Sequence, residues 1–166
     1  MRIYLAGRVP KGDTEAKSFT NWRVEYERAL KNILKDVEVI DPYSADVDES
    51  DFLLVVGSDS SHLKSADLII VNSQEKMGAG TAMELVIAKY LKKVVVTILP
   101  KDSHHRRSNV TFHGKLIEDW IHPFIYAFSD HVLEHIDEMA TLKLTKNPKD
   151  ITIIDEAIEY ARGLII

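Results

Sequence analysis

Residues 77–93 constrain the fold of this chain more than any other stretch. They follow a short apolar run at residues 68–71, open with a turn that contains Gly78 and Gly80, and lead into a second apolar run at residues 94–98. An apolar β-branched run, a glycine turn, a helical segment and another such run are typical of a βαβ unit. The chain therefore contains at least one parallel crossover.

Further apolar runs at residues 2–6, 37–40 and 124–128 bring the number of predicted strands to five. Residues 14–35 carry apolar side chains at three- and four-residue steps, which is typical of an amphipathic helix. Residues 51–65 contain a strand-like run, but a helix fits the connection to residues 68–71 better. We therefore expect a three-layer α/β sandwich with a five-stranded, mainly parallel sheet of the Rossmann or flavodoxin-like kind. Shorter helices are predicted at residues 112–120, 130–141 and 150–163, the last closed by Gly163, with polar loops at residues 43–50 and 101–109.

Length and composition limit the functional classes. The 166 residues predict a single domain, 1–166, and the net charge of −5 with no dominant basic run argues against an extended nucleic-acid footprint. The absence of cysteine excludes disulfides, thiol catalysis and thiolate metal sites. No apolar run reaches the ~18 residues of a membrane helix, and no signal-peptide pattern precedes residues 2–6. We expect a cytoplasmic enzyme or small-ligand-binding protein.

Glu84 is the leading candidate for a functional residue. We expect it in the first turn of the helix, where free N–H groups and the helix dipole favour an anion. From there the carboxylate would point over the carboxyl edge of the sheet, where open α/β folds bind ligands. A purely structural role as a first-turn acid explains Glu84 equally well. The neighbouring Gly78, Gly80 and Thr81 are candidate substrate contacts, although Met83 breaks a dinucleotide-binding fingerprint.

The loop after the first predicted strand is a candidate phosphate site. Gly7 and Gly12 have the spacing of a P-loop, but Asp13-Thr14 follows where Lys-Ser/Thr is required, which excludes a nucleoside triphosphatase. Arg8, Lys11 and the backbone amides still suit a single phosphate, and an ordinary solvated turn is the alternative. A second polar, basic loop at residues 101–109 is either another phosphate site or an ordinary solvated loop. Its candidate phosphate contacts are Arg106, Ser108 and Asn109.

A metal site is not expected. His131 and His135 lie four residues apart on a predicted helix, a spacing that can bind zinc. The glutamate that a zinc-protease helix carries directly after its first histidine is missing, so surface histidines are the better interpretation.

Together with Tyr4 and Asp59, the segment Gly80-Thr-Ala-Met-Glu84 makes the chain resemble the nucleoside 2-deoxyribosyltransferase-like family. This family includes deoxyribosyltransferases and 2′-deoxynucleoside 5′-monophosphate N-hydrolases. The other matching pieces are Arg-Ile-Tyr-Leu-Ala-Gly at residues 2–7 and the strand at residues 66–71, with Asp59 eight residues before Asp67. The likeness covers roughly residues 2–98 and is weak beyond Pro100.

The resemblance implies a retaining cleavage of the N-glycosidic bond. It makes Glu84 the nucleophile, Tyr4 the residue that holds its carboxylate, and Asp59 the group that assists departure of the base. It also implies that the loop at residues 7–12 surrounds the sugar 5′ end, that no metal or redox cofactor is needed, and that a neighbouring subunit completes the site. The apolar side chains of residues 52–56 exceed what one helix face can bury, so we expect a homodimer or higher homo-oligomer.

Three functions remain open at this point: hydrolysis of a (deoxy)nucleoside 5′-monophosphate, base exchange on unphosphorylated nucleosides, and non-catalytic nucleotide sensing. The basic residues in both edge loops favour hydrolysis. Retention of Tyr4, Asp59 and Glu84 together argues against a sensor, because binding alone needs no nucleophile. A more distant alternative, a cytokinin-activating phosphoribohydrolase, lacks support because its longer glycine-rich signature is absent.

Overall fold

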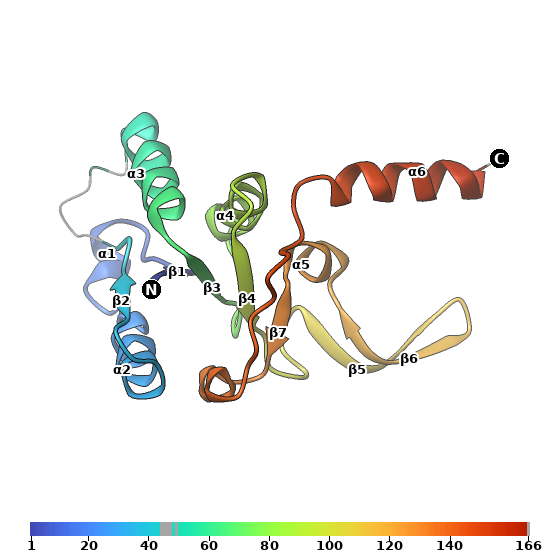
Figure 1. The fold of residues 1–166 in the computed structure, drawn as a ribbon, viewed down its shortest axis with the longest axis horizontal. Helices are drawn as coiled ribbons and strands as arrows, with labels where there is room; N and C mark the ends of the chain where they lie inside the picture. The colour runs from blue at the N-terminus through green and yellow to red at the C-terminus, as the bar shows by residue number, and fades with distance from the viewer. Residues whose placement is uncertain (44–47, 49, 166) are drawn as a thin grey trace.

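The computed structural model describes residues 1–43, 48 and 50–165. Its centre is a five-stranded, fully parallel sheet in the order β2-β1-β3-β4-β7 (Figure 1). This is the flavodoxin-like strand order, so the predicted fold class is confirmed. The strands are β1 (Arg2–Ala6), β2 (Glu38–Ile40), β3 (Leu68–Asn72), β4 (Val94–Ile98) and β7 (His131–Leu133).

Helices cover both faces of the sheet and give the predicted three layers (Figure 1). Alternation along β1 shows how the sequence builds both cores: Tyr4 and Ala6 are buried in one cluster, Ile3 and Leu5 in the other. One face carries α3 (Phe52–Ser65), α4 (Ala79–Tyr90) and α5 (Pro123–Phe128), and the other carries α2 (Arg23–Ile33) and the 3₁₀ helix η1 (Ile136–Ala140).

The helix predicted at residues 14–35 is two helices, α1 (Gly12–Ala16) and α2. α1 buries no side chain, whereas α2 buries Arg23, Tyr26 and Leu30 against the sheet. Only the second half of the segment therefore packs on the core, and the first half stays at the carboxyl edge of the sheet.

The helix predicted at residues 51–65 is confirmed as α3. Asp51 is its N-cap, and its carboxylate accepts hydrogen bonds from the backbone N–H groups of Leu53 and Leu54, both at 3.0 Å. Of the loop predicted at residues 43–50, residues 44–47 and 49 lie outside the described residues.

The strand predicted at residues 124–128 is wrong, because this segment is helix α5 and the edge strand is β7. Pro123 stands at the start of α5, where its missing N–H breaks no intrahelical hydrogen bond. A short apolar run does not distinguish a strand from a buried helix by periodicity.

The helix predicted at residues 112–120 is also wrong. Together with part of the predicted loop at residues 101–109, it forms an antiparallel hairpin of β5 (Arg106–Phe112) and β6 (Lys115–Ile121). His113 and Gly114 connect the strands with positive φ values of 49° and 78°, which are typical of a type I′ turn. The hairpin (yellow) and the last helix α6 (Ile153–Ile165, red) both extend away from the sheet (Figure 1). Gly163 lies inside α6 and does not close it.

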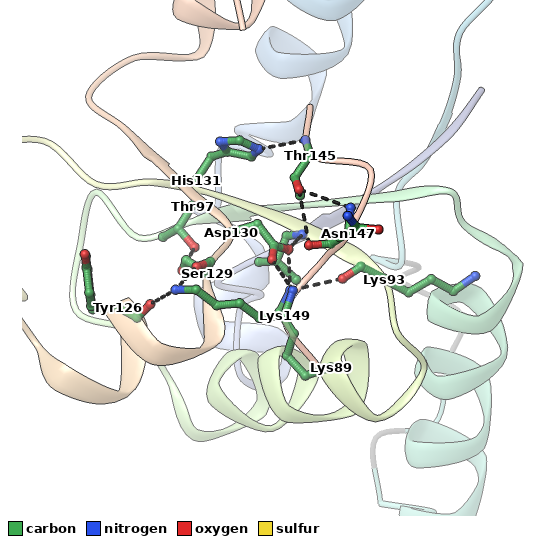
Figure 2. A network of polar contacts seen from close by, with 11 residues as sticks. Lys89, Lys93, Thr97, Tyr126, Ser129, Asp130, His131, Thr145, Asn147 and Lys149 are labelled. Atoms are coloured by element: carbon green, nitrogen blue, oxygen red, sulfur yellow. Dashed lines mark hydrogen bonds and ion pairs between the residues drawn. The ribbon is translucent and has the colours of Figure 1, made fainter. Parts of the chain in front are cut away.

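The helix predicted at residues 130–141, with Ser129 or Asp130 as its N-cap, is replaced by β7 and η1. Asp130 instead lies directly before β7. Its buried carboxylate accepts hydrogen bonds from Lys89 Nζ and from the backbone N–H groups of Val95 and Lys149, the latter two at 2.7 Å (Figure 2). The Lys149 ammonium in turn donates to the carbonyl oxygens of Tyr126 and Ser129 at 2.9 and 2.8 Å. This Asp130 network fastens the segment before α6 to α4 and β4.

The two histidines with zinc-like spacing make local contacts. His131 Nε2 accepts a hydrogen bond from the backbone N–H of Thr145 at 3.1 Å, and His135 forms a capping box with Glu138. Across residues 1–43, 48 and 50–165, no group of three or more His, Cys, Asp or Glu side chains is arranged to hold a metal ion. Within the same ranges, no helix has the length and apolar character needed to cross a membrane.

Candidate active site

The site lies where the direction of the sheet connections reverses. β1 and β3 are neighbours, but the chain leaves β1 toward β2 on one side and β3 toward β4 on the other. Such a switch point leaves a crevice beyond the carboxyl ends of the two strands. A cleft of about 550 Å³ lies there, bounded by the loop after β1, by α3 and by the start of α4.

Glu84 is buried at the inner end of this cleft, with 8% of its surface exposed. α4 begins at Ala79, so Glu84 lies in the second helical turn, and the first-turn position predicted from the sequence is wrong. Helical periodicity instead puts Glu84 on the same buried face as Leu85 and Ala88. The hydroxyl of Tyr4, which is fully buried on β1, donates a hydrogen bond to Glu84 Oε1.

The surroundings of Glu84 shift its ionisation toward neutral pH. Its pKa is raised to about 7, chiefly by burial and also by the charge of Asp59, whereas the Tyr4 hydrogen bond and the charge of Arg23 oppose the shift. Glu84 is thus protonated more readily near neutral pH than an exposed glutamate. Burial, followed by the charge of Glu84, holds the pKa of Tyr4 far above its usual value, so the phenol stays protonated and remains a donor.

Asp59 brings a second carboxyl group to the cleft from α3. Burial raises its pKa, and the charges of His62 and Arg23 partly offset this effect. His62 lies one helical turn further along α3, with its ring centroid 6.5 Å from that of Tyr4. The structure therefore joins Tyr4, Asp59 and Glu84 at one place, and both carboxyl groups have pKa values raised by burial.

The loop after β1 forms the opposite wall of the cleft. Gly7 and Arg8 line it directly, as predicted, whereas Gly12 has a positive φ of 67° and does not line it. A Cβ at Gly7 would lie 2.6 Å from Cζ2 of Trp22, so no larger residue fits beside that indole. The loop is therefore closely packed against Trp22 at this point.

Opposite charges meet at the rim of the cleft. Arg8 forms ion pairs with Glu75 at 3.2 Å and Glu15 at 3.8 Å, and the backbone N–H of Lys11 donates to Glu15 at 3.1 Å. These side chains are about half exposed or more, and exposed pairs of this kind contribute little to stability. An anionic ligand can therefore replace the carboxylates around Arg8 at small cost.

Gly78, Gly80 and Thr81 line the cleft on the α4 side, and their role as substrate contacts stays a prediction. Gly78 is the N-cap of α4 with φ −79°, and Gly80 belongs to the first helical turn, so neither residue needs the freedom of glycine for a tight turn. A Cβ added at Gly78 or Gly80 meets no atom within 4 Å. The missing side chains instead leave the cleft open beside Glu84.

Three predicted site residues do not reach the cleft of their own chain. Arg106, Ser108 and Asn109 lie on β5, and the Arg106 guanidinium forms a fork with Asp119 at 2.8 and 2.7 Å. The backbone N–H of Ser108 donates to Asp102 at 2.8 Å. A role for these three residues in phosphate binding stays a prediction.

Other residues that line the cleft were not predicted from the sequence. Lys76 follows β3 and lines the rim. Ligands bind beyond the carboxyl ends of strands in open α/β sheets, so the reasoning used for the loop after residues 2–6 would also have indicated Lys76. Arg23 occupies a core-facing position of α2 on the same face as Tyr26 and Leu30, which is unusual for an arginine. Tyr43 and Ser58 carried no comparable signal in the sequence.

Comparison with known proteins supports the fold assignment. No protein-family model matches the chain, and no curated protein sequence matches it significantly. The 2-deoxyribosyltransferase of the psychrotolerant bacterium Bacillus psychrosaccharolyticus is similar with a TM-score of 0.58 and 20% identity, over 90% of this chain and 98% of that one. A 2-deoxyribosyltransferase from Leishmania mexicana is similar with a TM-score of 0.50 and 15% identity, over 96% and 95% of the two chains.

The CMP N-glycosidase BcmB of Clostridium botulinum is similar with a TM-score of 0.47 and 17% identity, over 85% of this chain and 96% of that one. At these identities the likeness establishes the fold alone. The chain has the fold of the 2-deoxyribosyltransferases over most of its length, and the resemblance drawn from the sequence is confirmed at this level.

Proposed function

We propose that this protein hydrolyses the N-glycosidic bond of a (deoxy)nucleoside 5′-monophosphate through a covalent glycosyl–Glu84 intermediate and releases the free base. The observation that carries the proposal is the hydrogen bond from Tyr4 to the buried Glu84, beside Asp59, at the inner end of an open cleft. Two proteins with the same fold are 2-deoxyribosyltransferases, which supports chemistry at the sugar carbon that bears the base.

In the first step the ionised Glu84 attacks C1′ of the sugar while the C–N bond breaks. The bonding electron pair leaves with the base, and Asp59, whose pKa burial raises, donates the proton that the base nitrogen needs. The transition state resembles an oxocarbenium ion, so the negative charge of Glu84 stabilises it.

In the second step a water molecule attacks C1′ and breaks the glycosyl ester. The Asp59 carboxylate takes a proton from this water, and the electron pair of the C–O bond returns to Glu84. Tyr4 remains protonated and donates to the departing carboxylate, which stabilises its charge. The products are the free base and a sugar phosphate, and both carboxyl groups return to their starting states.

The charges at the rim support a phosphorylated substrate. Arg8, Lys11 and Lys76 line the cleft, and the loop that carries Arg8 follows the sheet edge where the 5′ end of a sugar would lie. Base exchange on unphosphorylated nucleosides is the second candidate. It is favoured by the pairing of Arg8 with Glu15 and Glu75, which already neutralises that cation.

One experiment separates these functions. The protein is incubated with ribo- and deoxyribonucleosides and their 5′-monophosphates, with and without a second base, and chromatography follows free base and exchanged nucleoside. Hydrolysis predicts free base from monophosphates. Exchange that depends on the second base would support the transferase, and tight binding without base release would support a nucleotide sensor.

Single substitutions locate the phosphate. Arg8→Ala and Lys76→Ala should each raise KM for monophosphates far more than for nucleosides, because the lost contact is with the phosphate alone. Lys17→Ala removes the same charge from an exposed position that does not line the cleft, and should leave both KM values unchanged. Equal effects on the two substrate types would move the phosphate away from this rim.

We also propose that the protein self-associates through α3. Phe52 and Leu53 are 72% and 70% exposed, and Leu54 and Val56 are exposed beside them. An apolar patch next to a cleft is typical of an interface. Light scattering at micromolar concentration should give at least a dimer, and Phe52→Glu should weaken it. A wild-type mass near 18.9 kDa would contradict self-association.

A further inference from the structure

Arg23 is a buried charge at the centre of the candidate active site. It stands at the start of α2, where the amphipathic pattern expects an apolar side chain, and only 1% of its surface is exposed. A fully buried arginine is costly unless its donors and its charge are both satisfied. The contacts of Arg23 therefore indicate what it is for.

The guanidinium group binds the carboxyl end of β1 and the turn that follows it. Nε donates to the carbonyl oxygen of Leu5 at 2.9 Å, Nη2 to that of Gly7 at 2.8 Å, and Nη1 to that of Arg8 at 3.2 Å. Its central carbon also lies 4.4 Å from the ring centroid of Trp22. One side chain thus holds one carbonyl group of β1 and two of the turn that lines the cleft.

Anionic and polar groups surround this cation from several elements. Asp41, after β2, approaches Nε to 3.3 Å and is partly exposed. Burial lowers the pKa of Arg23, and the charge of Asp41 opposes this shift, followed by those of Glu84 on α4, Tyr4 on β1 and Asp59 on α3. The carboxylate of Asp41 is therefore in ion-pair contact with the guanidinium, and Glu84 and Asp59 act on it through their charge.

The groups that face Glu84 include one buried cation. Within the described chain, Tyr4 acts on Glu84 through its neutral hydroxyl, Asp59 disfavours the ionised form, and Arg23 favours it. His62 acts on Asp59. The remaining cations that line the cleft are exposed at its rim, where water and salt screen them: Arg8, Lys11 and Lys76.

We propose that Arg23 is the positioning residue of this site: its guanidinium fork fixes the Gly7–Arg8 turn against the substrate, and its buried positive charge acts on Glu84. The inference rests on the proposed glycosidase function, because an ionised Glu84 is what a nucleophile requires. It also assigns the two tasks to different properties of one side chain: the planar fork holds the turn, and the positive charge acts on Glu84.

Two substitutions separate these tasks. Arg23→Met removes the charge and the fork, so the pKa of Glu84 should rise above its wild-type value of about 7. Arg23→Lys keeps the charge but cannot bind three carbonyl groups at once, so the pKa should stay near the wild-type value while KM rises. Arg28→Met, at an exposed position on the same helix, is the matched control and should change neither quantity.

The direct readout is an NMR titration of ¹³C-labelled glutamate carboxyl groups in the ligand-free protein, with Glu84→Gln used to assign the Glu84 signal. Arg23→Met should shift that titration to higher pH. Turnover at pH 7 should then fall about fivefold for a rise of one pKa unit, since a pKa of about 8 in place of about 7 lowers the ionised fraction from about one half to about one tenth. It should recover as the pH rises toward about 9. A purely structural role would lower turnover equally at both pH values.

An unchanged Glu84 titration in Arg23→Met would overturn the electrostatic part, and wild-type KM in Arg23→Lys would overturn the positioning part. If Arg23→Met does not fold, Arg23→Gln carries the same test, because its amide is uncharged and still donates to a carbonyl group. The titration needs no turnover. Failure of the wild-type protein to release any base would therefore refute the glycosidase proposal and leave this measurement intact.

Discussion

The hydroxyl of Tyr4 donates a hydrogen bond to the Glu84 carboxylate, although 80 residues separate the two in the sequence. The sheet explains why they meet: β1, which carries Tyr4, pairs with β3, and the chain runs from β3 into α4, which carries Glu84. Each partner thus belongs to a regular element packed on the core. A donor on a strand and an acceptor on a helix keep the carboxylate in one orientation before any substrate arrives.

Tyr4→Phe tests what this hydrogen bond does. The bond lowers the pKa of Glu84, so its loss should raise that pKa above about 7 and move the acid limb of the kcat/KM profile to higher pH. Activity should fall most at pH 6 and recover in part at pH 8. The pH dependence of kcat/KM measures both effects.

Tyr26→Phe is the matched control for Tyr4→Phe. Tyr26 is buried on the other face of the sheet, and its hydroxyl has no hydrogen-bond partner among the described residues. Its pH profile should match that of the wild-type protein. An identical shift in both variants would mean that the effect of Tyr4→Phe comes from general loosening of the core.

The buried Glu84 should make stability depend on pH. Its folded-state pKa of about 7 lies above the ordinary value of 4.5, so its contribution to stability is fully present below pH 4.5 and is lost as the pH rises through 7. Glu84→Gln escapes this loss. Relative to the wild-type protein, the variant should gain up to about 3 kcal/mol in unfolding free energy between pH 5 and pH 8.

Denaturant unfolding at a series of pH values measures this difference. The same substitution should also abolish turnover, so the residue would be costly for stability and required for chemistry. A difference between Glu84→Gln and the wild-type protein that stays constant across the pH range would show that Glu84 titrates normally.

Gly80→Ala separates fold from function on α4. The residue is helical and a Cβ meets no atom within 4 Å, so alanine should stabilise the protein by about 0.4–1 kcal/mol. The methyl group would extend into the cleft beside Glu84, so nucleotide binding should weaken. Thermal melting and calorimetric titration measure the two effects.

Gly163→Ala provides the comparison for Gly80→Ala. It is a second helical glycine with open space around its Cβ position, but it lies on α6 and does not line the cleft. It should raise stability without changing nucleotide affinity. Unchanged affinity in Gly80→Ala as well would place the ligand away from the start of α4.

The sequence was sufficient for four of the five strands, and it pointed to Tyr4, Asp59 and Glu84 as candidate site residues. The runs at residues 2–6, 68–71 and 94–98 are bounded by clear turn signals, and Glu84 follows from the helix that starts after residues 68–71. Tyr4 and Asp59 came from the family resemblance. Lys76 could have been predicted too, because it follows the run at residues 68–71 at the carboxyl edge of the sheet. Arg23 could not, because an amphipathic pattern hides a charged residue whose partners are backbone carbonyl groups elsewhere in the chain.

The C-terminal third was largely mispredicted for a related reason. The apolar run at residues 124–128 fits both a strand and a short buried helix, and the position of Pro123 decides between the two. Asp130 has the sequence signature of a helix cap, but its partners Lys89, Val95 and Lys149 come from three other segments. Local signals cannot indicate contacts of that range.

The Asp130 network should be a major source of stability. The Lys89 and Asp130 side chains are 0% and 2% exposed, so Asp130→Ala leaves a buried ammonium group without its counter-charge. Such a change costs about 3–5 kcal/mol in unfolding free energy. Lys89→Met combined with Asp130→Ala removes both charges and should recover part of the loss.

Arg162→Ala is the control for Asp130→Ala. It breaks the ion pair between Arg162 and Glu159, two side chains that are 70% and 71% exposed. The substitution should therefore have no measurable effect on thermal unfolding. An equally small effect of Asp130→Ala would mean that the buried network contributes no more than a surface pair.

The nucleophilic role of Glu84 is the central claim, and mass spectrometry of the quenched reaction tests it most directly. Asp59→Asn should slow hydrolysis of the glycosyl ester more than its formation when the base leaves easily, so the intermediate should accumulate. The account predicts a sugar-phosphate adduct on the peptide that contains Glu84, and no adduct in a protein that also carries Glu84→Gln. An adduct on another residue, or a Glu84→Gln protein that still releases base at a near-normal rate, would contradict it.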